Sequence, residues 1–469
     1  MLEQPIGGFS GLFEALSPVK RPLGALSSVS NLVIEQGSVL TTRPGLAQVG
    51  GQVAAAKVNG IHPYYNTVSG SSQLLAHVGT GLYRWDDATE SWETIDATAL
   101  ADAPSTSCHL NDLLLIWDGT NKKKWDGTTL ADLGGSPPAA KYAISAYEQV
   151  FVTGISDRPA DVDFCDVAAP ETWTPAPGND AGSISVGAKE GDFNTWVGFD
   201  KIQGKVIIWS RYGIIVLHGP DTPNRPGLWS VQAVLPYGTP NGRTVRRVGK
   251  LWIWLSDDGF VTWGGGSTEP VREPIKNSFA LIDWSNIANA CAWVDKDERY
   301  WCCVPVTSGG VKYFCFDPGH GWFTGTGKDI RASGSYRFSG KETPLVGDKD
   351  GNIYKIEGDD DAGAAIDWEA IVGPSLFGES GRKKELAYVN LLLSLASEAT
   401  AYGAVSTAES GAFGSDKEVT ANETITQVEL AVPFEAEQLT RAPMFRLKLH
   451  GSGKVNLYDA VLSIRKAGK

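Results

Sequence analysis

The chain has 469 residues, including 54 glycines, 25 prolines and 16 tryptophans, and 42% of its residues are hydrophobic. This length exceeds that of most single domains, and the content of turn formers and aromatic residues favours an all-β protein and excludes a disordered one. The formal net charge of -13 at pH 7 argues against a protein that wraps nucleic acid, because binding to phosphates needs clustered lysine and arginine.

The cysteines show no CxxC pair and no spacing typical of a disulfide scaffold, so buried free thiols are expected. No N-terminal stretch has the features of a signal peptide, and no run of about 18 apolar residues is present. We therefore expect a protein that is made and folded in a reducing cytoplasm, without a membrane anchor. The six cysteines are Cys108, Cys165, Cys291, Cys302, Cys303 and Cys315.

Residues 1–50 are predicted to form an extended N-terminal arm. Gly7-Gly8, Pro18, Pro22 and Pro44 break this segment into short pieces, and within it only Asn31 to Leu40 has the character of a strand or two. The arm therefore connects or clasps other parts of the chain and is not itself a blade.

Residues 51–363 carry a repeated hairpin pattern. In the clearest copy, GKLWIWLSDDGFVTWGGG, two aromatic and β-branched strands flank Asp258-Gly259, which suits a tight reversal. Similar turns occur near residues 81, 119, 157, 213, 259, 309 and 351, so neighbouring turns are separated by 38 residues (81 to 119) to 56 residues (157 to 213). Because one blade of about four short strands needs this interval, the pattern predicts a β-propeller of about seven blades, with the arm or a late strand closing the ring.

Residues 364–469 are predicted to form a C-terminal antiparallel β-sandwich. Glycine and aspartate between Gly358 and Gly363 mark its boundary, and the segments ITQVELAVPF, MFRLKLHG and VNLYDAVLSIRK have the composition of strands. The segment LAYVNLLLSLAS is either a strand or a helix, because a short apolar run does not define its own period.

One loop has oxygen side chains at alternate positions, as in a calcium site: Asp348, Asp350 and Asn352. The position of Gly351 and the absence of helical flanks favour an ordinary hairpin turn. The six histidines are scattered, without zinc-ligand spacing. We therefore predict no metal site and no cofactor.

The sequence predicts that the protein is not an enzyme. It contains no GxSxG, HExxH or P-loop motif. The stretch Ser256 to Trp263 nearly matches the Asp-box of sialidase propellers, with its glycine one place early. That box shapes a turn away from the chemistry, so no catalytic residue is assigned.

Three basic clusters stand out against the acidic background, and each is interpreted either as a solvated loop or as a contact with an acidic neighbouring subunit. The first is placed in a hairpin loop, the second before the clearest hairpin and the third at the start of the C-terminal unit. The candidate subunit-docking residues are Lys122, Lys123, Lys124, Arg243, Arg246, Arg247, Arg382, Lys383 and Lys384.

Two sets of segments resemble virion proteins of tailed bacteriophages. The arm segments Asn31-Leu32, Gly37-Ser38-Val39 and Arg43-Pro44-Gly45 resemble the opening of many such proteins. The order of segments in the middle of the chain is similar to that in phage neck and tail propellers; these segments are Pro170 to Trp173, Gly187 to Gly191, Lys205 to Gly219 and Ser256 to Trp263.

The resemblance implies a structural protein of the tail nozzle, hub or head-to-tail connector type, located in the virion and assembled in the host cytoplasm. Its expected partners are other copies of itself in a ring and adjacent tail or neck proteins. Genomic DNA would pass transiently without specific binding, repelled from the wall by the acidic surface.

Two other functions stay open from the sequence. One is a carbohydrate-binding or carbohydrate-cleaving propeller at the host-contacting end of a tail. The other is a cellular propeller scaffold that binds proteins, which the arm motif and the lack of WD-type signatures disfavour.

Overall fold

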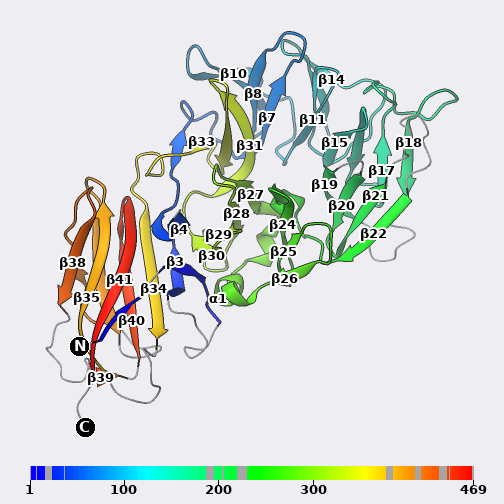
Figure 1. Ribbon diagram of the computed structural model, residues 1–469. Helices are drawn as coiled ribbons and strands as arrows, with labels where there is room; N and C mark the ends of the chain where they lie inside the picture. Colours follow the sequence, from blue (N-terminus) through cyan, green and yellow to red (C-terminus); the bar gives the residue numbers. More distant parts are fainter. Residues whose placement is uncertain are drawn as a thin grey trace.

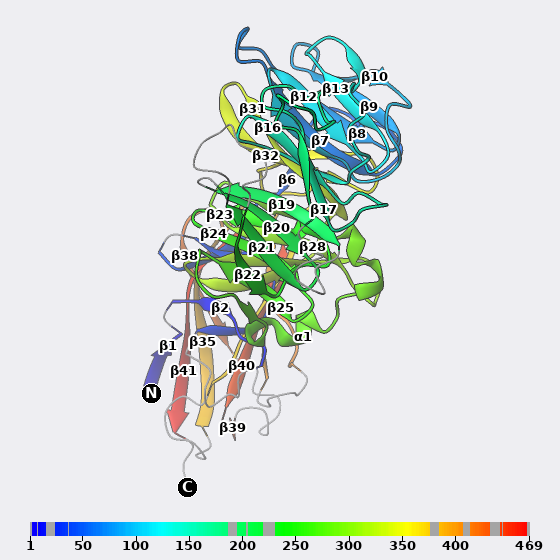
Figure 2. The same ribbon diagram turned by 90° about the vertical axis from the view of Figure 1, so that its right-hand side faces the viewer.

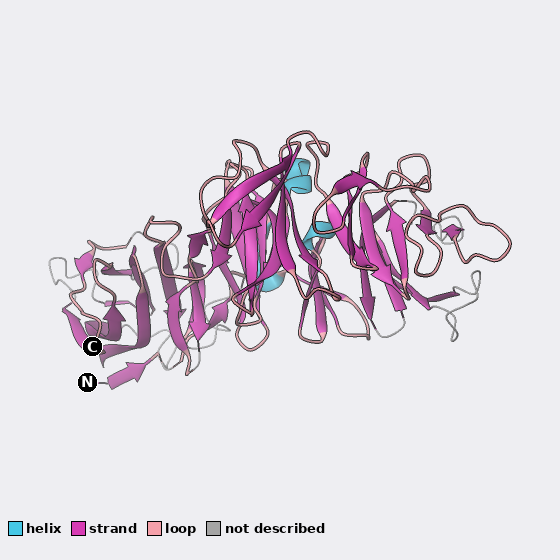
Figure 3. Ribbon diagram, turned by 90° about the horizontal axis from the view of Figure 1, so that it is seen from above, coloured by secondary structure: helices cyan, strands magenta, loops and turns pink. Residues whose placement is uncertain are grey.

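The computed structural model of the chain describes residues 2–6, 8–15, 24–35, 37–185, 195–202, 205–218, 230–375, 384–406, 413–431, 441–442 and 444–466. Strands dominate these residues (Figure 3), and helices are confined to a few short turns. The chain is a seven-bladed β-propeller joined to a β-sandwich, which confirms the predicted fold class (Figure 1).

The first four blades are four-stranded antiparallel sheets in chain order. Blade 1 comprises β7 (Val58–Tyr65), β8 (Ser72–Val78), β9 (Gly81–Asp86) and β10 (Ser91–Asp96). Blade 2 comprises β11 (Thr106–Leu110), β12 (Leu113–Trp117), β13 (Lys122–Trp125) and β14 (Leu130–Asp132). Blade 3 comprises β15 (Tyr142–Ala146), β16 (Gln149–Thr153), β17 (Asp161–Phe164) and β18 (Gly182–Ser185). Blade 4 comprises β19 (Trp196–Ile202), β20 (Lys205–Ser210), β21 (Gly213–His218) and β22 (Ser230–Pro236).

The last three blades follow the same plan, and the final one takes its outer strand from the arm. Blade 5 comprises β23 (Arg246–Val248), β24 (Leu251–Ser256), β25 (Gly259–Trp263) and β26 (Glu269–Val271). Blade 6 comprises β27 (Cys291–Val294), β28 (Tyr300–Pro305), β29 (Val311–Asp317) and β30 (Gly321–Gly325). Blade 7 comprises β31 (Ile330–Phe338), β32 (Lys341–Asp348), β33 (Ile353–Ile356) and β6 (Leu46–Gln48). The short helices are η2 (Gly242–Thr244), η3 (Glu273–Ile275), α1 (Lys276–Phe279) and η4 (Trp284–Asn289).

Each of the seven turns predicted from the sequence lies at or beside the connection between the second and third strands of a blade. The turn in blade 5 differs in detail from the prediction, because Asp257 and Asp258 make the reversal and Gly259 already belongs to β25. Gly259 does have a positive φ, of 151°, and a Cβ there would lie 2.9 Å from the carbonyl oxygen of Val271. The close approach of β26 therefore explains why position 259 is a glycine.

The first strands of the blades lie nearest the propeller axis: β7, β11, β15 and β19 are successive neighbours, as are β23, β27, β31 and β7, and η2 contacts both β19 and β27. Hydrophobic layers fill the spaces between adjacent blades. The tryptophans contribute to these layers: Trp209 of blade 4 and Trp254 of blade 5, for example, meet edge to face at 6.0 Å. All six cysteines are buried free thiols, as predicted.

Strand β6 of the arm closes the ring. It pairs antiparallel with β33, placing Leu46 opposite Ile356 and Gln48 opposite Tyr354. One of the two closures expected from the sequence is therefore present, and the first and last blades are joined through a segment that precedes both.

The sandwich contains two sheets. The first has the order β38-β35-β41-β5-β4, with β1 beside β41 and β39 beside β35. The second has the order β2-β3-β34-β40-β36-β37. The C-terminal strands are β34 (Asp367–Ser375), β35 (Lys384–Leu395), β36 (Thr400–Ser406), β37 (Lys417–Glu418), β38 (Thr426–Ala431), β39 (Arg441–Ala442), β40 (Phe445–Ser452) and β41 (Val455–Lys466).

The N-terminal residues clasp other parts of the chain, but they do not form the separate extended arm that was expected, because most of them belong to the sandwich. They form β1 (Leu2–Pro5), β2 (Ser10–Leu12), β3 (Ala25–Ser30), β4 (Leu32–Glu35) and β5 (Val39–Thr42). Buried apolar side chains such as Leu26, Val33 and Leu40 explain this placement, since each needs a sheet partner to leave water. Figure 2 shows β1 and β2 beside the long sandwich strands, and both chain ends lie at this end of the molecule.

The ambiguous segment LAYVNLLLSLAS is a strand. It lies within β35, which pairs with β38 on one side and β41 on the other. A strand with partners on both edges and Leu386, Val389 and Leu391 buried gains more from the sandwich than an isolated apolar helix would. Among the described residues no helix is long and apolar enough to cross a membrane.

Candidate functional site

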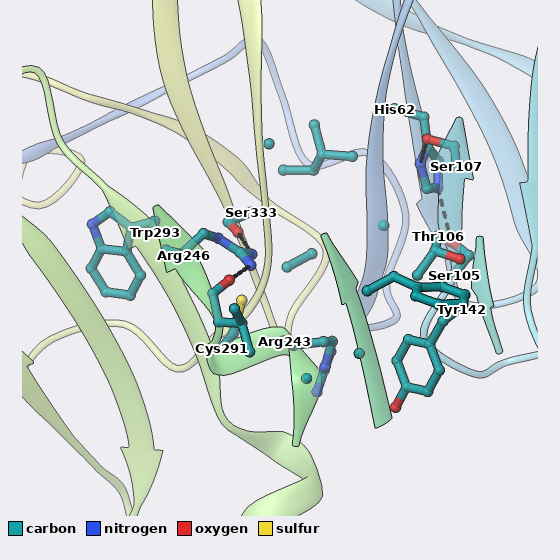
Figure 4. Close-up of a pocket in the computed structure, with 18 of the residues that line it drawn as sticks. His62, Ser105, Thr106, Ser107, Tyr142, Arg243, Arg246, Cys291, Trp293 and Ser333 are labelled. Carbon is teal, nitrogen blue, oxygen red and sulfur yellow. Dashed lines mark hydrogen bonds between the residues drawn. The ribbon is translucent and has the colours of Figure 1, made fainter. Parts of the chain in front are cut away.

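The central channel of the propeller contains a cavity of about 630 Å³ (Figure 4). Its walls come from the first strands of the blades and from η2, so side chains far apart in the sequence converge there. The polar and charged side chains of the lining include His62, Tyr142, Asp200, Arg243, Arg246 and Ser333.

Arg243 and Arg246 reach this channel because a capped turn precedes β23. Asn241 caps η2 by accepting a hydrogen bond from the backbone N–H of Arg243 at 3.0 Å. Arg243 donates to the carbonyl oxygens of Arg331 and Ala288, both at 2.6 Å. These contacts hold the guanidinium against the channel wall.

Arg246 and Arg247 follow on β23. Arg246 donates to the carbonyl oxygen of Val245 at 2.6 Å and to Ser333 Oγ at 2.5 Å. Arg247 is exposed, donates to the carbonyl oxygen of Gly249 at 3.0 Å, and lies 5.0 Å from the ring centroid of Trp252. The interpretation of this cluster as a solvated loop is therefore wrong for Arg243 and Arg246, which line the interior of the ring.

The channel is locally basic in an acidic protein. Within the part of the chain that the structure describes, none of Arg243, Arg246 and Arg247 has a carboxylate within 4.0 Å. Among the described residues of the lining, Asp200 is the one acidic residue, and it accepts a hydrogen bond from Trp252 Nε1 at 2.6 Å. Burial lowers the pKa of Arg243 below its ordinary value, and the like charges of Arg331 and Arg246 act in the same direction.

A histidine and serine cluster forms another part of the wall. His62 hydrogen-bonds through Nδ1 to Ser107 Oγ at 2.9 Å and through Nε2 to Ser105 Oγ at 2.8 Å, and His77 Nδ1 contacts Ser105 Oγ at 2.8 Å. Burial is the first cause that lowers the pKa of His62 to about 3 and of His77 to about 4. Both rings are therefore neutral near pH 7, and such low pKa values make them poor general bases. The cluster connects β7 and β8 of blade 1 with β11 of blade 2 and the residue just before it.

The first basic cluster lies elsewhere than predicted. Lys122, Lys123 and Lys124 are on strand β13, so their placement in a hairpin loop is wrong. Lys123 pairs with Asp132 and Lys124 with Glu171, each at 2.7 Å. These acidic partners within the chain explain why Lys123 and Lys124 tolerate a strand position.

The third basic cluster falls largely outside the described residues. Arg382 and Lys383 are among the residues that the structure does not describe, and Lys384 is the first residue of β35. A docking role for this cluster stays a prediction.

The calcium-like loop has the geometry of a braced turn. Asp348 Oδ1 accepts the backbone N–H groups of Asp350 and Asn352 at 2.9 Å, and Asp348 Oδ2 accepts the Tyr354 hydroxyl at 2.8 Å. Asp350 is paired with Lys349 at 2.7 Å. Among the described residues no group of three His, Cys, Asp or Glu side chains could hold a metal ion.

The stretch that resembles an Asp-box is also a structural turn. Asp257 pairs with Arg211 of the neighbouring blade at 2.8 Å, and Trp263 Nε1 donates to the carbonyl oxygen of Gly266 at 2.9 Å. None of the residues from Ser256 to Trp263 lines the channel cavity.

Asn31 and Arg43 of the arm form a hydrogen-bonded junction between propeller and sandwich. Arg43 donates to both carboxylate oxygens of Asp361, at 2.9 and 2.5 Å, and Arg43 Nε donates to Asn31 Oδ1 at 3.0 Å. Asn31 Nδ2 donates to the carbonyl oxygen of Asp367 at 2.8 Å, and Asn31 Oδ1 accepts the backbone N–H of Thr326 at 2.9 Å. The buried motif thus connects blade 6, the interdomain turn and the sandwich.

The sequence marked the basic cluster of the channel but not its location. The signal was present, because the residues just before each predicted hairpin belong to the first strand of a blade, which faces the axis. His62, Ser105 and Ser107 carried no recognisable spacing, since they meet only when the first strands of blades 1 and 2 pack side by side.

No protein-family model matches the chain, and no curated protein matches it. Among solved structures, it is similar to the extracellular domain of the putative one component system BT4673 from B. thetaiotaomicron, with 10% sequence identity and a TM-score of 0.44. The match covers 89% of this chain and 60% of that one, so the chain spans less than two thirds of the length of that domain. A similarity of this size carries no argument about function.

Proposed function

We propose that the protein is a non-enzymatic structural component of a bacteriophage tail or neck, of the nozzle, hub or connector type. Several copies form a ring that is part of the DNA ejection conduit and docks neighbouring tail or neck proteins. The proposal rests on the sequence resemblance, and the observation that carries it further is the junction made by the same motif.

The junction supports a building-block role because it fixes one unit on the other. Arg43 is 3% exposed in its side chain, and its ion pair with Asp361 is buried between propeller and sandwich. A bidentate ion pair at this junction fixes the orientation of the two units relative to each other as well as the distance between them. Subunits that must repeat around a ring benefit from a defined angle between their two parts.

The conduit in this proposal is the lumen of the ring and not the centre of the propeller. The propeller channel has the volume of a small-molecule site, which is far too small for duplex DNA. The net charge of -13 supports repulsion of DNA from the wall of the lumen. A basic lumen surface in the assembled ring would contradict this mechanism without affecting the assignment to a virion.

The alternative of a carbohydrate-cleaving propeller has less support. Glycoside hydrolysis generally needs two carboxyl groups on either side of the scissile bond. The described lining of the channel offers one, Asp200, which is already hydrogen-bonded to Trp252.

Immunogold electron microscopy tests the proposal. Antibodies raised against the purified chain should label one end of tailed particles produced by cells that carry its gene, and pre-immune serum should not. Native mass spectrometry of the purified chain or of particle fragments should show an assembly whose mass is an integer multiple of 50.1 kDa, as expected for a closed ring of identical chains. Particles that carry no label, together with a protein found only in the cell fraction, would refute the virion role.

A further inference from the structure

The central channel concentrates positive charge that the described residues leave uncompensated. A guanidinium has five N–H donors, and Arg243 and Arg246 each donate to two acceptors among the described residues. All four of these acceptors are neutral carbonyl or hydroxyl oxygens. Three donors on each side chain therefore remain for a ligand or for water.

This arrangement is unfavourable in an empty channel. A charged group that is partly removed from water needs an opposite charge or a complete set of hydrogen bonds. Arg331, another nearby arginine, has such a partner in Asp329 at 2.7 Å, whereas Arg243 and Arg246 face the cavity without a carboxylate partner among the described residues. An anion between them would supply the missing charge.

The walls are suited to hold a ligand in a fixed place. His62 is held by two serine hydroxyls, and Ser333 is oriented by a hydrogen bond to the carbonyl oxygen of Ala292 at 2.8 Å. A Cβ at Gly334 would come within 2.8 Å of Ile61, so the backbone is closely packed behind the lining. Tyr142 adds an aromatic ring and a hydroxyl on the side nearer to Arg243 (Figure 4).

We propose that the central channel binds a small polyanion, a molecule with two or more phosphate or carboxylate groups. Arg243 and Arg246 are the principal ligands, and the exposed Arg247 adds a third positive charge. Arginine suits both kinds of group because its planar fork matches two oxygens at once. The cavity of about 630 Å³ has the size of a small-molecule site and not that of a macromolecular groove. This inference does not depend on the virion role.

Isothermal titration calorimetry of the full chain tests the site with two probes, pyrophosphate and citrate, and with acetate as a monoanion control. We expect saturable binding of one probe molecule per chain for at least one of the two polyanions, and much weaker binding of acetate. The comparison of the two probes distinguishes a phosphate ligand from a carboxylate ligand. Absence of binding by both at millimolar concentration would overturn the proposal.

Three variants locate the binding. Arg246→Gln keeps a donor for Ser333 and removes the charge, and Arg247→Ala removes an exposed side chain; neither should unfold the protein. Arg246→Gln should weaken binding of the probe by about tenfold or more, since a hydrogen bond to a charged group is lost. Arg211→Ala is the matched control, because it removes one positive charge that is paired with Asp257 outside the channel.

Circular dichroism melting confirms that each variant is folded. A dissociation constant that changes equally in Arg246→Gln and Arg211→Ala would mean that only net charge matters, and it would refute the channel site. A dissociation constant unchanged in both Arg246→Gln and Arg247→Ala would refute it as well.

Discussion

Arg43 connects the propeller to the sandwich, a role that its local sequence did not reveal. Its place in an Arg-Pro-Gly turn is common, but its side chain enters the junction and meets Asp361, Asn31 and the carbonyl oxygen of Thr326. Its guanidinium also lies 5.6 Å from the ring centroid of Tyr313. A buried ion pair of this kind is expensive to break because the remaining charge has no water to replace its partner.

Substitution of Arg43 by alanine should lower the free energy of unfolding by about 3–5 kcal/mol, since Asp361 would keep a buried charge without a partner. Urea unfolding measures the change. The control is Arg211→Ala, whose ion pair with Asp257 is more exposed and should contribute less than about 1 kcal/mol. An equal decrease in the free energy of unfolding of the two variants would show that burial does not strengthen the Arg43–Asp361 ion pair.

The buried histidines predict that stability falls in mild acid. In the unfolded chain an imidazole titrates near pH 6.5, whereas in the folded protein the pKa is about 3 for His62 and about 4 for His77. The unfolded chain therefore binds more protons below pH 6.5. The stabilisation is complete above pH 6.5 and decreases toward pH 4, by about 1.4 kcal/mol per pH unit for each imidazole.

Urea unfolding between pH 7.5 and pH 5 measures this slope. His77→Gln should reduce the slope by the share of one imidazole, because glutamine does not titrate. Nearby Asp102 and Asp118 have lowered pKa values and stay ionised over this range. A slope that is the same in the variant and the original protein would show that His77 is not the titrating group.

Strand β6 closes the propeller by completing the sheet of blade 7. It is only three residues long, yet it joins the two ends of the propeller. Gly45 precedes it where the chain passes the backbone of Asp360, and a Cβ at Gly45 would lie 2.1 Å from the carbonyl oxygen of that residue. The glycine of the Arg-Pro-Gly motif is therefore required by close approach of two backbones.

Gly45→Ala should destabilise the protein by more than about 1 kcal/mol, because backbone would have to move to accept the methyl group. Gly51→Ala, just beyond β6, is the matched control: nothing lies within 4 Å of a Cβ there, and the change should be within about 0.5 kcal/mol. Denaturant unfolding measures the change in the free energy of unfolding for each variant. Similar effects at both positions would contradict the role of the Asp360 contact.

Across the whole molecule, one hydrophobic cluster links blades 5, 6 and 7 of the propeller with the sandwich. A single cluster contains Phe260 and Tyr300 of blades 5 and 6, Val33 of the arm, and Leu386 and Leu447 of the sandwich. Because the cluster is continuous, neither unit can unfold without exposing apolar surface of the other. The arm strengthens this coupling by contributing strands to both.

Scanning calorimetry of the full chain should therefore show one cooperative unfolding transition. Arg43→Ala should move that transition to lower temperature or split it, since it weakens the junction and leaves the blades and the sandwich sheets intact. Two well-separated transitions in the unsubstituted protein would show that the units are independent.

The blade repeat and the C-terminal strands follow from local patterns in the sequence. Each hairpin is encoded by neighbouring residues, so all seven turns were predictable, and the alternation of side chains in Phe445–Ser452 identifies a strand without its partners. The basic cluster around Arg243 was also visible as composition. Its position was not, because a cluster near a hairpin has the same sequence whether it faces water or the ring axis.

Sequence alone determined that this is an all-β chain of repeated hairpins with an acidic surface and a separate strand-rich C-terminus. Only the tertiary structure decided that the arm completes both the sandwich and the seventh blade, that Arg43 meets Asp361 some 318 positions away, and that Arg243 and Arg246 share a cavity with His62. Turn residues and the alternation of apolar and polar side chains are properties of short stretches of chain, whereas ring closure and buried charge depend on which distant strands are brought together.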